Sequence, residues 1–192
     1  MKDTFFETTF DKLNASATPL TQGEYDHCIF HLCDFSNADL SGLRFSDCSF
    51  TGCNMTLVKL IKTSFQDVKF SDCKILGVRF DQCHEFALSF SFDNCILNHS
   101  SFFKLKQKKI RFKNSQLHEV DFTQCDASHA VFDNCDLLRA HFENTILEKA
   151  DFRTAYNYSI DPEINRIKKA KFSLSEVAGL LNKYDIEIDS AN

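Results

Sequence analysis

Large apolar residues recur at every fifth position along most of the chain. The series runs from Tyr25 to Phe80, breaks, and resumes two residues out of phase from Phe92 to Phe152. Neither an α-helix, with about 3.6 residues per turn, nor a β-strand, with a period of two, produces this spacing. Of the 21 Phe in the chain, 17 follow the series once its two ends are included. A five-residue structural repeat is therefore the basic unit of the chain.

A period of 20 residues is superimposed on the period of five. Four pentapeptides then complete one coil, one for each side of a square, and successive coils stack at the ~4.8 Å spacing of β-strands. Because hydrogen bonds between coils satisfy the backbone, the turns need few of the Gly and Pro residues of ordinary hairpins, and the chain has only 5 Gly and 2 Pro. We predict one column of stacked rings along the core: Phe10, Phe30, Phe50, Phe70, Phe92, Phe112, Phe132, Phe152 and Phe172.

The position two residues before each large one is restricted mainly to Cys, Ala, Val, Ser and Thr, and all nine Cys lie there. Two residues in every five therefore point inward, and the other three, mostly polar, face water. Free Cys behaves as a small buried hydrophobe, and zinc-ligand spacings such as Cys-x2-Cys are missing. We interpret the thiols as core residues and predict no metal site. The inward small positions include Cys28, Cys33, Cys48, Cys53, Cys73, Cys95, Cys125 and Cys135.

This pattern, with motifs such as Cys33-Asp-Phe-Ser-Asn-Ala-Asp-Leu-Ser and Ala150-Asp-Phe-Arg, resembles the pentapeptide-repeat family over roughly residues 5–172. The resemblance implies an all-β solenoid, namely the right-handed quadrilateral β-helix of that family. The periodicity alone gives the square coil but not its hand. We expect the β-helix to occupy residues 1–172 and a short module to occupy residues 173–192.

The repeat is interrupted once by two extra residues. The interval between Phe70 and Phe92 is 22 residues instead of 20, and Cys83 still keeps the earlier phase, so the extra residues lie within 84–91. We predict a small bulge carrying Phe86 or Phe90. A tolerated insertion and a knob that contacts a partner both remain open as its meaning.

Charge is unevenly distributed along the chain. The net charge is −5, but residues 81–113 carry 3 acids and 6 bases, whereas residues 114–160 carry 8 acids and 3 bases. All six bases of the first segment fall within residues 104–113, where Gln107 also occupies a core position. Binding of phosphate groups by this basic band and a merely solvated edge are the two alternatives.

The carboxyl end departs from the repeat. Ser173-Leu-Ser-Glu176 matches a capping box, apolar residues follow at helical spacing, and residues 185–189 alternate like a short strand. A helix and strand there would cover the open end of the solenoid. This layout resembles the module that pairs two chains end to end in the Qnr-type (quinolone-resistance) proteins, which implies a homodimer; capping alone is the alternative. The candidate interface is Leu174, Val177, Ala178, Leu181, Ile186 and Ile188.

Signatures of catalysis are missing from the sequence. The seven His lie off the two inward positions and share no column, and there is no nucleophile elbow, phosphate-binding Gly loop or His-Glu-x-x-His motif. We predict no enzymatic activity and no cofactor. The sequence has no signal-peptide pattern and no run approaching ~18 apolar residues. We therefore expect a cytoplasmic protein without membrane association.

Three functions remain open. The first is an interaction protein that presents the rod surface to an unknown protein partner. The second, implied by the Qnr-type resemblance, is a DNA mimic that binds DNA gyrase or topoisomerase IV and modulates it or protects it from quinolones. The third is weak binding of anions or nucleic acid through residues 104–113, although this band lacks the other features of a nucleic-acid module.

The DNA-mimic hypothesis rests on regularly spaced carboxylates that could compete for a basic groove. Two features depart from the Qnr-type pattern: the basic band interrupts the acidic rod, and the chain lacks long projecting loops. The candidate acids are Asp121, Asp126, Asp133, Asp136, Glu143, Glu148 and Asp151.

Overall fold

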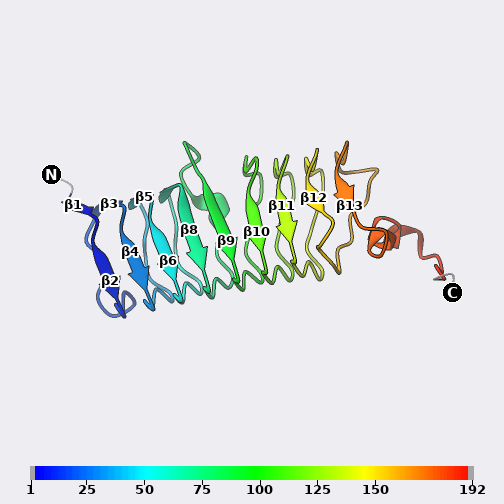
Figure 1. Ribbon diagram of the computed structural model, residues 1–192. Coiled ribbons are helices and arrows are strands. Elements are labelled where there is room, and N and C mark those ends of the chain that lie inside the picture. Colours follow the sequence, from blue (N-terminus) through cyan, green and yellow to red (C-terminus); the bar gives the residue numbers. More distant parts are fainter. Residues whose placement is uncertain (1–2, 190–192) are drawn as a thin grey trace.

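The computed structural model describes residues 3–189, which wind into a parallel β-solenoid with about 20 residues per coil (Figure 1). The architecture is the predicted right-handed quadrilateral β-helix of the pentapeptide-repeat proteins. Parallel strands are paired between coils, so each coil hydrogen-bonds to the next along the axis of the rod. Register is offset by 20 residues, as in Phe30 opposite Phe50, except across the insertion, where Phe70 lies opposite Phe92.

We number the four faces of the rod in chain order from the longest sheet. Face 1 is a nine-stranded sheet: β2 (Thr9–Asp11), β4 (Ile29–His31), β6 (Ser49–Thr51), β8 (Val68–Ser71), β9 (Phe90–Asp93), β10 (Arg111–Lys113), β11 (Val131–Asp133), β12 (Asp151–Phe152) and β13 (Lys171–Phe172). Faces 2 and 3 are joined by isolated bridges such as Asp34–Asn54 and Ser101–Asp121. Face 4 is a four-stranded sheet before the insertion and isolated bridges after it: β1 (Asp3–Phe6), β3 (Gly23–Asp26), β5 (Arg44–Ser46) and β7 (Ser64–Gln66).

The column of Phe rings behind face 1 runs the length of the described rod. Consecutive rings are stacked, with centroids 4.6 Å apart for Phe30 and Phe50 and 5.3 Å apart for Phe112 and Phe132. The column is fully buried between Phe30 and Phe152, while Phe10 and Phe172 at its ends are only partly buried. Since a dispersion contact repeats at every step, the column fills the interior without a cavity.

All nine Cys are free and buried. Several thiols donate to the carbonyl of the large residue 23 positions earlier, as Cys53 does to Phe30 at 3.4 Å and Cys73 to Phe50 at 3.4 Å. Thr63 makes the same bond to Leu40 at 2.8 Å, which explains why hydroxyl side chains share this position. The small inward residue therefore links one coil to the previous one, in addition to filling space.

The corners of the coil place residues other than Gly in the left-handed region. His27 (φ 55°), Asp47 (φ 52°) and Lys109 (φ 66°) are examples, whereas only three described Gly have positive φ. The left-handed conformation costs roughly 1–2 kcal/mol for an ordinary residue. At most of these corners the backbone N–H donates to the next coil, as from Asp47 to the Gln66 carbonyl at 2.9 Å, and these bonds offset the cost.

The two extra residues form a bulge between faces 3 and 4. The 3₁₀-helix η1 (Phe80–Gln82) precedes it, and ladder hydrogen bonds resume from Ser89 to Phe65. Phe86 points into solvent with 79% of its surface exposed, whereas Phe90 is buried. In Figure 1 the bulge is seen as the loop that rises between β8 and β9.

The carboxyl-terminal module differs from the α-helix and strand predicted for it. It contains two 3₁₀-helices, η2 (Val177–Leu180) and η3 (Asn182–Tyr184), and Glu176 makes no capping hydrogen bond. The predicted capping box is wrong, because the Ser173 hydroxyl pairs with that of Ser175 instead. Residues 185–189 form no strand, since no partner strand lies beside them in the described chain. No helix within residues 3–189 is long and apolar enough to cross a membrane.

Candidate interaction surfaces

Face 1 carries a shallow groove that runs across neighbouring strands. Three depressions, of about 290, 270 and 430 Å³, follow one another along it. The first two share Lys69, Ser91 and Arg111, and the last two share Val131 and Asp133. The three depressions therefore adjoin one another from β8 to β12, across strands that are paired on both sides, and we call them together the groove of face 1.

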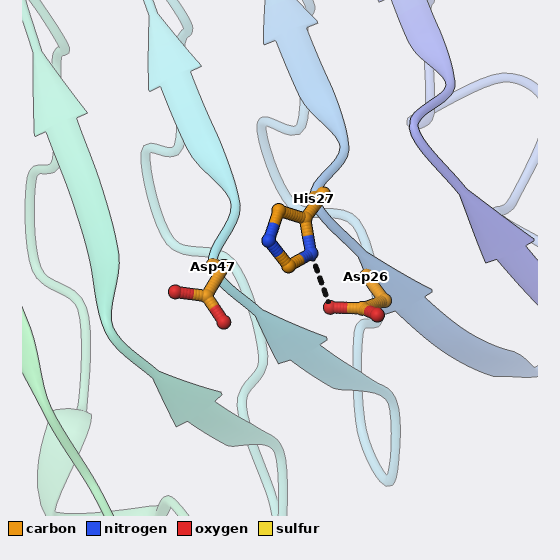
Figure 2. A group of neighbouring side chains, drawn as sticks. All are labelled: Asp26, His27 and Asp47. Carbon is orange, nitrogen blue, oxygen red and sulfur yellow. Dashed lines mark hydrogen bonds and ion pairs between the residues drawn. The ribbon is translucent and has the colours of Figure 1, made fainter.

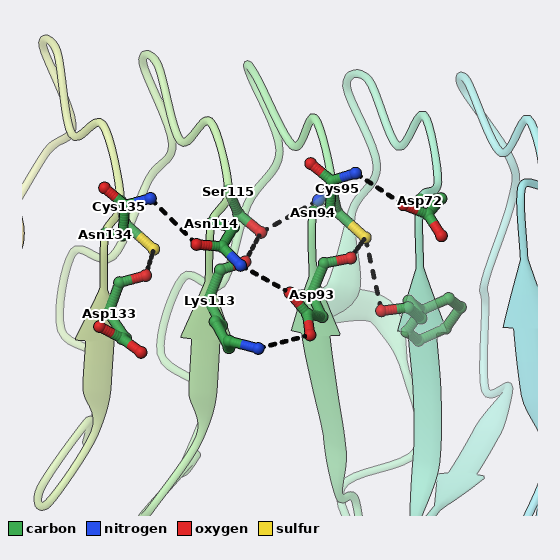
Figure 3. A network of polar contacts seen from close by, with 11 residues as sticks. Asp72, Asp93, Asn94, Cys95, Lys113, Asn114, Ser115, Asp133, Asn134 and Cys135 are labelled. Carbon is green, nitrogen blue, oxygen red and sulfur yellow. Dashed lines mark hydrogen bonds and ion pairs between the residues drawn. The ribbon is translucent and has the colours of Figure 1, made fainter.

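Charges of opposite sign alternate along one column of this groove. Asp93, Lys113, Asp133 and Arg153 occupy equivalent positions in successive coils, and Lys113 Nζ lies 3.1 Å from Asp93 Oδ2 (Figure 3). At the neighbouring corner, Asn114 donates to Asp93 at 3.2 Å. Such exposed pairs contribute little stability, but they fix a pattern of charge on a rigid surface.

Lys69 and Arg111 lie on either side of Ser91 in the ladder of β8, β9 and β10. Among residues 3–189, neither base takes part in an ion pair, and both are exposed. Lys69 was not predicted as part of a basic surface, because the basic band was defined as one continuous segment, residues 104–113. Aligning successive coils with one another, and allowing for the 22-residue step, places Lys69 and Arg111 on either side of Ser91.

The structure divides the basic band between faces. Lys106 and Lys108 lie on face 4, where Lys108 is 3.5 Å from Asp126, while Arg111 and Lys113 lie on face 1. Gln107 between them is buried, and its amide donates to the Leu88 carbonyl at 3.1 Å. The polar core residue therefore satisfies a carbonyl that belongs to the bulge.

The seven candidate DNA-mimic acids do not gather on one face. Asp133 and Asp151 lie on face 1, Asp136 on face 2, Asp121 and Glu143 on face 3, and Asp126 and Glu148 on face 4. Four of them are paired with bases, the distances being 3.5 Å to Lys108, 2.8 Å to His118, 2.6 Å to Arg166 and 2.7 Å to Arg153. Hydrogen bonds from Arg153 lower the pKa of Asp151. The acids thus form local pairs and not a single row of like charge.

The exposed carboxyl-terminal end is apolar. Leu174 is 91% exposed, Ile186 and Ile188 are more than half exposed, and Val177 and Leu181 are partly exposed. Ala178 is half-buried on the same segment. These six predicted interface residues therefore lie together on the final segment of the described chain, with much of their surface facing solvent.

A backbone contact docks this segment on the last coil. Ile160 donates to the Gly179 carbonyl at 3.0 Å, and Tyr184 Oη donates to Glu163 at 2.8 Å. A Cβ on Gly179 would lie 2.3 Å from the Tyr158 carbonyl oxygen, so only glycine permits this approach. The docking explains why η2 is short and irregular.

The chain is a rod built from stacked coils of about 20 residues. The family models described as "Pentapeptide repeat region" and "Pentapeptide repeats (8 copies)" match residues 23–90 and 115–153, which together exceed half of the chain. The chain belongs to the pentapeptide-repeat family. Members of this family are generally non-catalytic structural or interaction proteins.

Solved structures share the fold. Full-length QnrB1, a plasmid-mediated fluoroquinolone resistance protein, is similar with a TM-score of 0.53 and 18% identity, over 96% of this chain and 100% of that chain. HetL, a pentapeptide-repeat protein involved in heterocyst differentiation regulation from the cyanobacterium Nostoc sp. strain PCC 7120, gives a TM-score of 0.48 and 15% identity, over 89% and 84%. At 18% identity the likeness to QnrB1 is one of fold. No curated protein sequence matches the chain.

Proposed function

We propose that this protein is a non-enzymatic, cytoplasmic interaction protein that presents the groove of face 1 to a protein partner. The observation that carries the proposal is the row of three adjoining depressions from β8 to β12 on the nine-stranded sheet. Because stacked side chains fill the interior, the rod can recognise a partner without changing shape. Preorganisation of this kind lowers the entropic cost of binding.

The charged side chains of the groove indicate which charges a partner surface should carry. Lys69 and Arg111 have no acidic partner within residues 3–189, so they are free to pair with carboxylates of another protein. Farther along the groove, Asp133 and Asp151 lie beside Val131. Asp151 is paired with Arg153, whereas Asp133 takes part in no ion pair within residues 3–189. A partner surface with acidic groups facing Lys69 and Arg111 and a basic group facing Asp133 therefore complements this pattern.

Site-specific photo-crosslinking tests the proposal. A photoreactive residue at Ser91, inside the groove, should crosslink a specific protein in cells of the source organism, and the same residue at Lys59, on face 3, should not. The crosslink should disappear in the K69E/R111E variant and persist in the K62E/K104E variant, whose changes lie at a different corner. Equal loss in both variants, or crosslinking from Lys59 alone, would contradict the assignment to face 1.

The second candidate is a DNA mimic that acts on a type II topoisomerase. Likeness to QnrB1 over nearly the whole of both chains supports this candidate at the level of fold. The distribution of the acids over four faces and their pairing with bases weigh against a continuous phosphate-like row. Asp121, Asp133 and Glu143, which take part in no ion pair within residues 3–189, remain available for such a role.

A supercoiling assay with gyrase from the source organism, with and without a fluoroquinolone, distinguishes the two candidates. Mimicry predicts rescue from the drug, or inhibition that weakens in the D121N/D133N/E143Q variant and not in K69E/R111E. No effect at a large excess of the protein would remove this candidate and leave the proposal for face 1 intact. Salt-dependent retention on heparin would instead favour weak anion binding by the basic band.

We also propose that two chains pair end to end through the carboxyl-terminal module. The exposed apolar side chains of Leu174 and Ile186 support this arrangement, since pairing would bury them. Light scattering should give twice the chain mass of 22.1 kDa for the intact protein. The L174D/I186D variant, in which both changes are at exposed positions, should give the mass of one chain. A monomeric intact protein would overturn the dimer.

A further inference from the structure

One corner of the rod collects acidic side chains around a histidine. Glu7, His27, Asp47 and Asp67 occupy the corner between faces 4 and 1 in four successive coils, and all have left-handed φ angles between 47° and 55°. Their backbones are held by bonds between coils, from Glu7 to Asp26 at 3.0 Å and from His27 to Ser46 at 2.9 Å. The corner is thus a fixed frame on which the side chains lie one coil apart.

His27 lies between two carboxylates on this frame. Its Nδ1 is 2.9 Å from Asp26 Oδ1 on β3, and Asp47 of the next coil lies on the other side of the ring (Figure 2). One potential ligand atom from each of Asp26, His27 and Asp47 lies within 4.8 Å of the other two. Ligands about 2.0–2.2 Å from a common ion lie roughly 3 to 3.5 Å from one another, so the exposed His27 ring and the Asp47 side chain would have to turn toward Asp26 to surround one centre.

No base neutralises this corner within the described chain. Among residues 3–189, Lys and Arg form no ion pair with Glu7, Asp26, Asp47 or Asp67; Asp67 accepts a hydrogen bond from the Ser89 hydroxyl instead. At several other places on the rod, an acid is paired with Lys or Arg of the next coil, as Glu24 is with Arg44 at 3.0 Å. The excess of negative charge at this corner therefore favours a bound cation.

We propose that Asp26, His27 and Asp47 form a binding site for one divalent transition-metal ion of the Zn²⁺ type. An imidazole nitrogen with two carboxylate oxygens suits Zn²⁺, whereas Ca²⁺ and Mg²⁺ prefer oxygen ligands alone. The ion binds one nitrogen of the neutral imidazole, so binding releases a proton when His27 is protonated. Water completes the coordination, because the site is open to solvent.

The site would connect two coils. Asp26 and His27 belong to one coil and Asp47 to the next, so an ion held by all three adds a link between coils near the amino-terminal end of the rod. Since the unfolded chain does not hold the three groups together, the ion should stabilise the folded state in proportion to its concentration. This link is independent of the face 1 groove.

The chain contains its own control for the proposal. His31, the last residue of β4, is also paired with a carboxylate, Nδ1 lying 2.7 Å from Asp11 Oδ1 of the previous coil. The equivalent of Asp47 in that column is Thr51, which lies opposite His31 and offers no carboxylate. His31 therefore has one neighbouring carboxylate where His27 has two, so only His27 should hold a metal.

Isothermal titration of the full-length protein with ZnCl₂, with the fold monitored by circular dichroism, tests the site. We expect one site per chain whose affinity falls at least tenfold in H27A and in D47N, remains unchanged in H31A, and is not displaced by excess Ca²⁺. Adding a carboxylate with T51D should create a second site at His31. Absence of binding, equal losses in H27A and H31A, or binding unaffected by D47N would overturn the proposal. Neither H27A nor D47N removes a Cys. Zinc bound by the buried thiols would therefore be retained in both variants, and a loss of binding in them assigns the zinc to this site.

Discussion

The coils before and after the insertion are built on different pairs of aromatic columns. Before it, rings line faces 4 and 1, as with Phe45 and Phe50 in edge contact at 5.5 Å. After it, the second column lies on face 3, where Phe122 meets Phe132 of face 1 at 5.7 Å and 90°. The column behind face 1 continues through both regions, so the rod keeps one axis while its partner column changes sides.

The bulge is where this exchange takes place. Phe90 lies 6.3 Å from Phe65, the last ring of the face 4 column, and 5.1 Å from Phe80, where the face 3 column begins. Phe80 then stacks on Phe102 at 4.9 Å. The four-stranded sheet of face 4 ends at the same point. Face 1, which keeps its rings throughout, forms regular strands in both regions, face 4 forms strands only where it carries rings, and face 3 forms isolated bridges even beside its own ring column.

The largest effect should come from truncating either second column. Phe45→Ala before the insertion and Phe122→Ala after it should each lower the free energy of unfolding by about 3–5 kcal/mol, because both rings are buried in stacked columns. Urea unfolding measures both. If only one substitution lowers the free energy of unfolding by this amount, the second columns of the two regions do not contribute equally to stability.

Filling the vacated face should be the next most costly change. Face 4 holds Phe45 before the insertion but Ala127 after it, and both are buried. Ala127→Phe should overpack the interior already occupied by Phe122 and cost about 1–3 kcal/mol. A neutral or stabilising result would contradict the exchange of columns. Thermal unfolding of this variant against Ala130→Ser, a small change in the same coil, provides the measurement.

Replacing Gln107 should lower the free energy of unfolding, because its side chain donates a hydrogen bond to the bulge. Gln107→Leu keeps the volume but leaves the Leu88 carbonyl without its 3.1 Å partner, and it should cost about 1–3 kcal/mol. Gln66→Leu, on the exposed side of β7, is the control and should change stability by less than about 0.5 kcal/mol. Equal effects would mean that the carbonyl finds another donor.

Buried thiols make both regions sensitive to alkaline pH. Burial raises the pKa of Cys48 before the insertion and of Cys125 and Cys135 after it to about 12. The unfolded chain loses these protons near pH 9 while the folded chain retains them, so stability should be constant below about pH 8 and fall as pH rises from about 9 to 12. The fall should be smaller in Cys125→Ala. Stability that rises in this window would contradict the burial of the thiols.

Much of the frame could be predicted from the sequence, because each position in the pentapeptide has one environment. The period of five placed Phe112 and Cys73 in the interior, and the period of 20 placed Phe30 opposite Phe50. The exchange of columns could not be predicted, since it depends on how Phe80 and Phe90 pack around the bulge. The left-handed corners were also hidden, because ordinary residues such as Lys109 adopt them when a coil-to-coil hydrogen bond compensates.

The surfaces were harder to predict than the core. The acids were grouped by sequence segment, yet consecutive pentapeptides point to different faces, so Asp121 and Asp126 diverge. Asp26, His27 and Asp47 come together only because residues one coil apart are neighbours. The carboxyl-terminal segment matched a helix pattern, but close approach of Gly179 to Tyr158 gives 3₁₀-helices there instead.

We infer that the interior columns hold the rod together, which leaves the side chains of face 1 free for recognition. Urea unfolding of Phe112→Ala and of K69E/R111E tests it directly. We predict a loss of about 3–5 kcal/mol for the buried ring and less than about 1 kcal/mol for the two exposed bases, which form no ion pair within residues 3–189. A loss in K69E/R111E as large as that in Phe112→Ala would show that the bases of face 1 hold the coils together, and would contradict the claim.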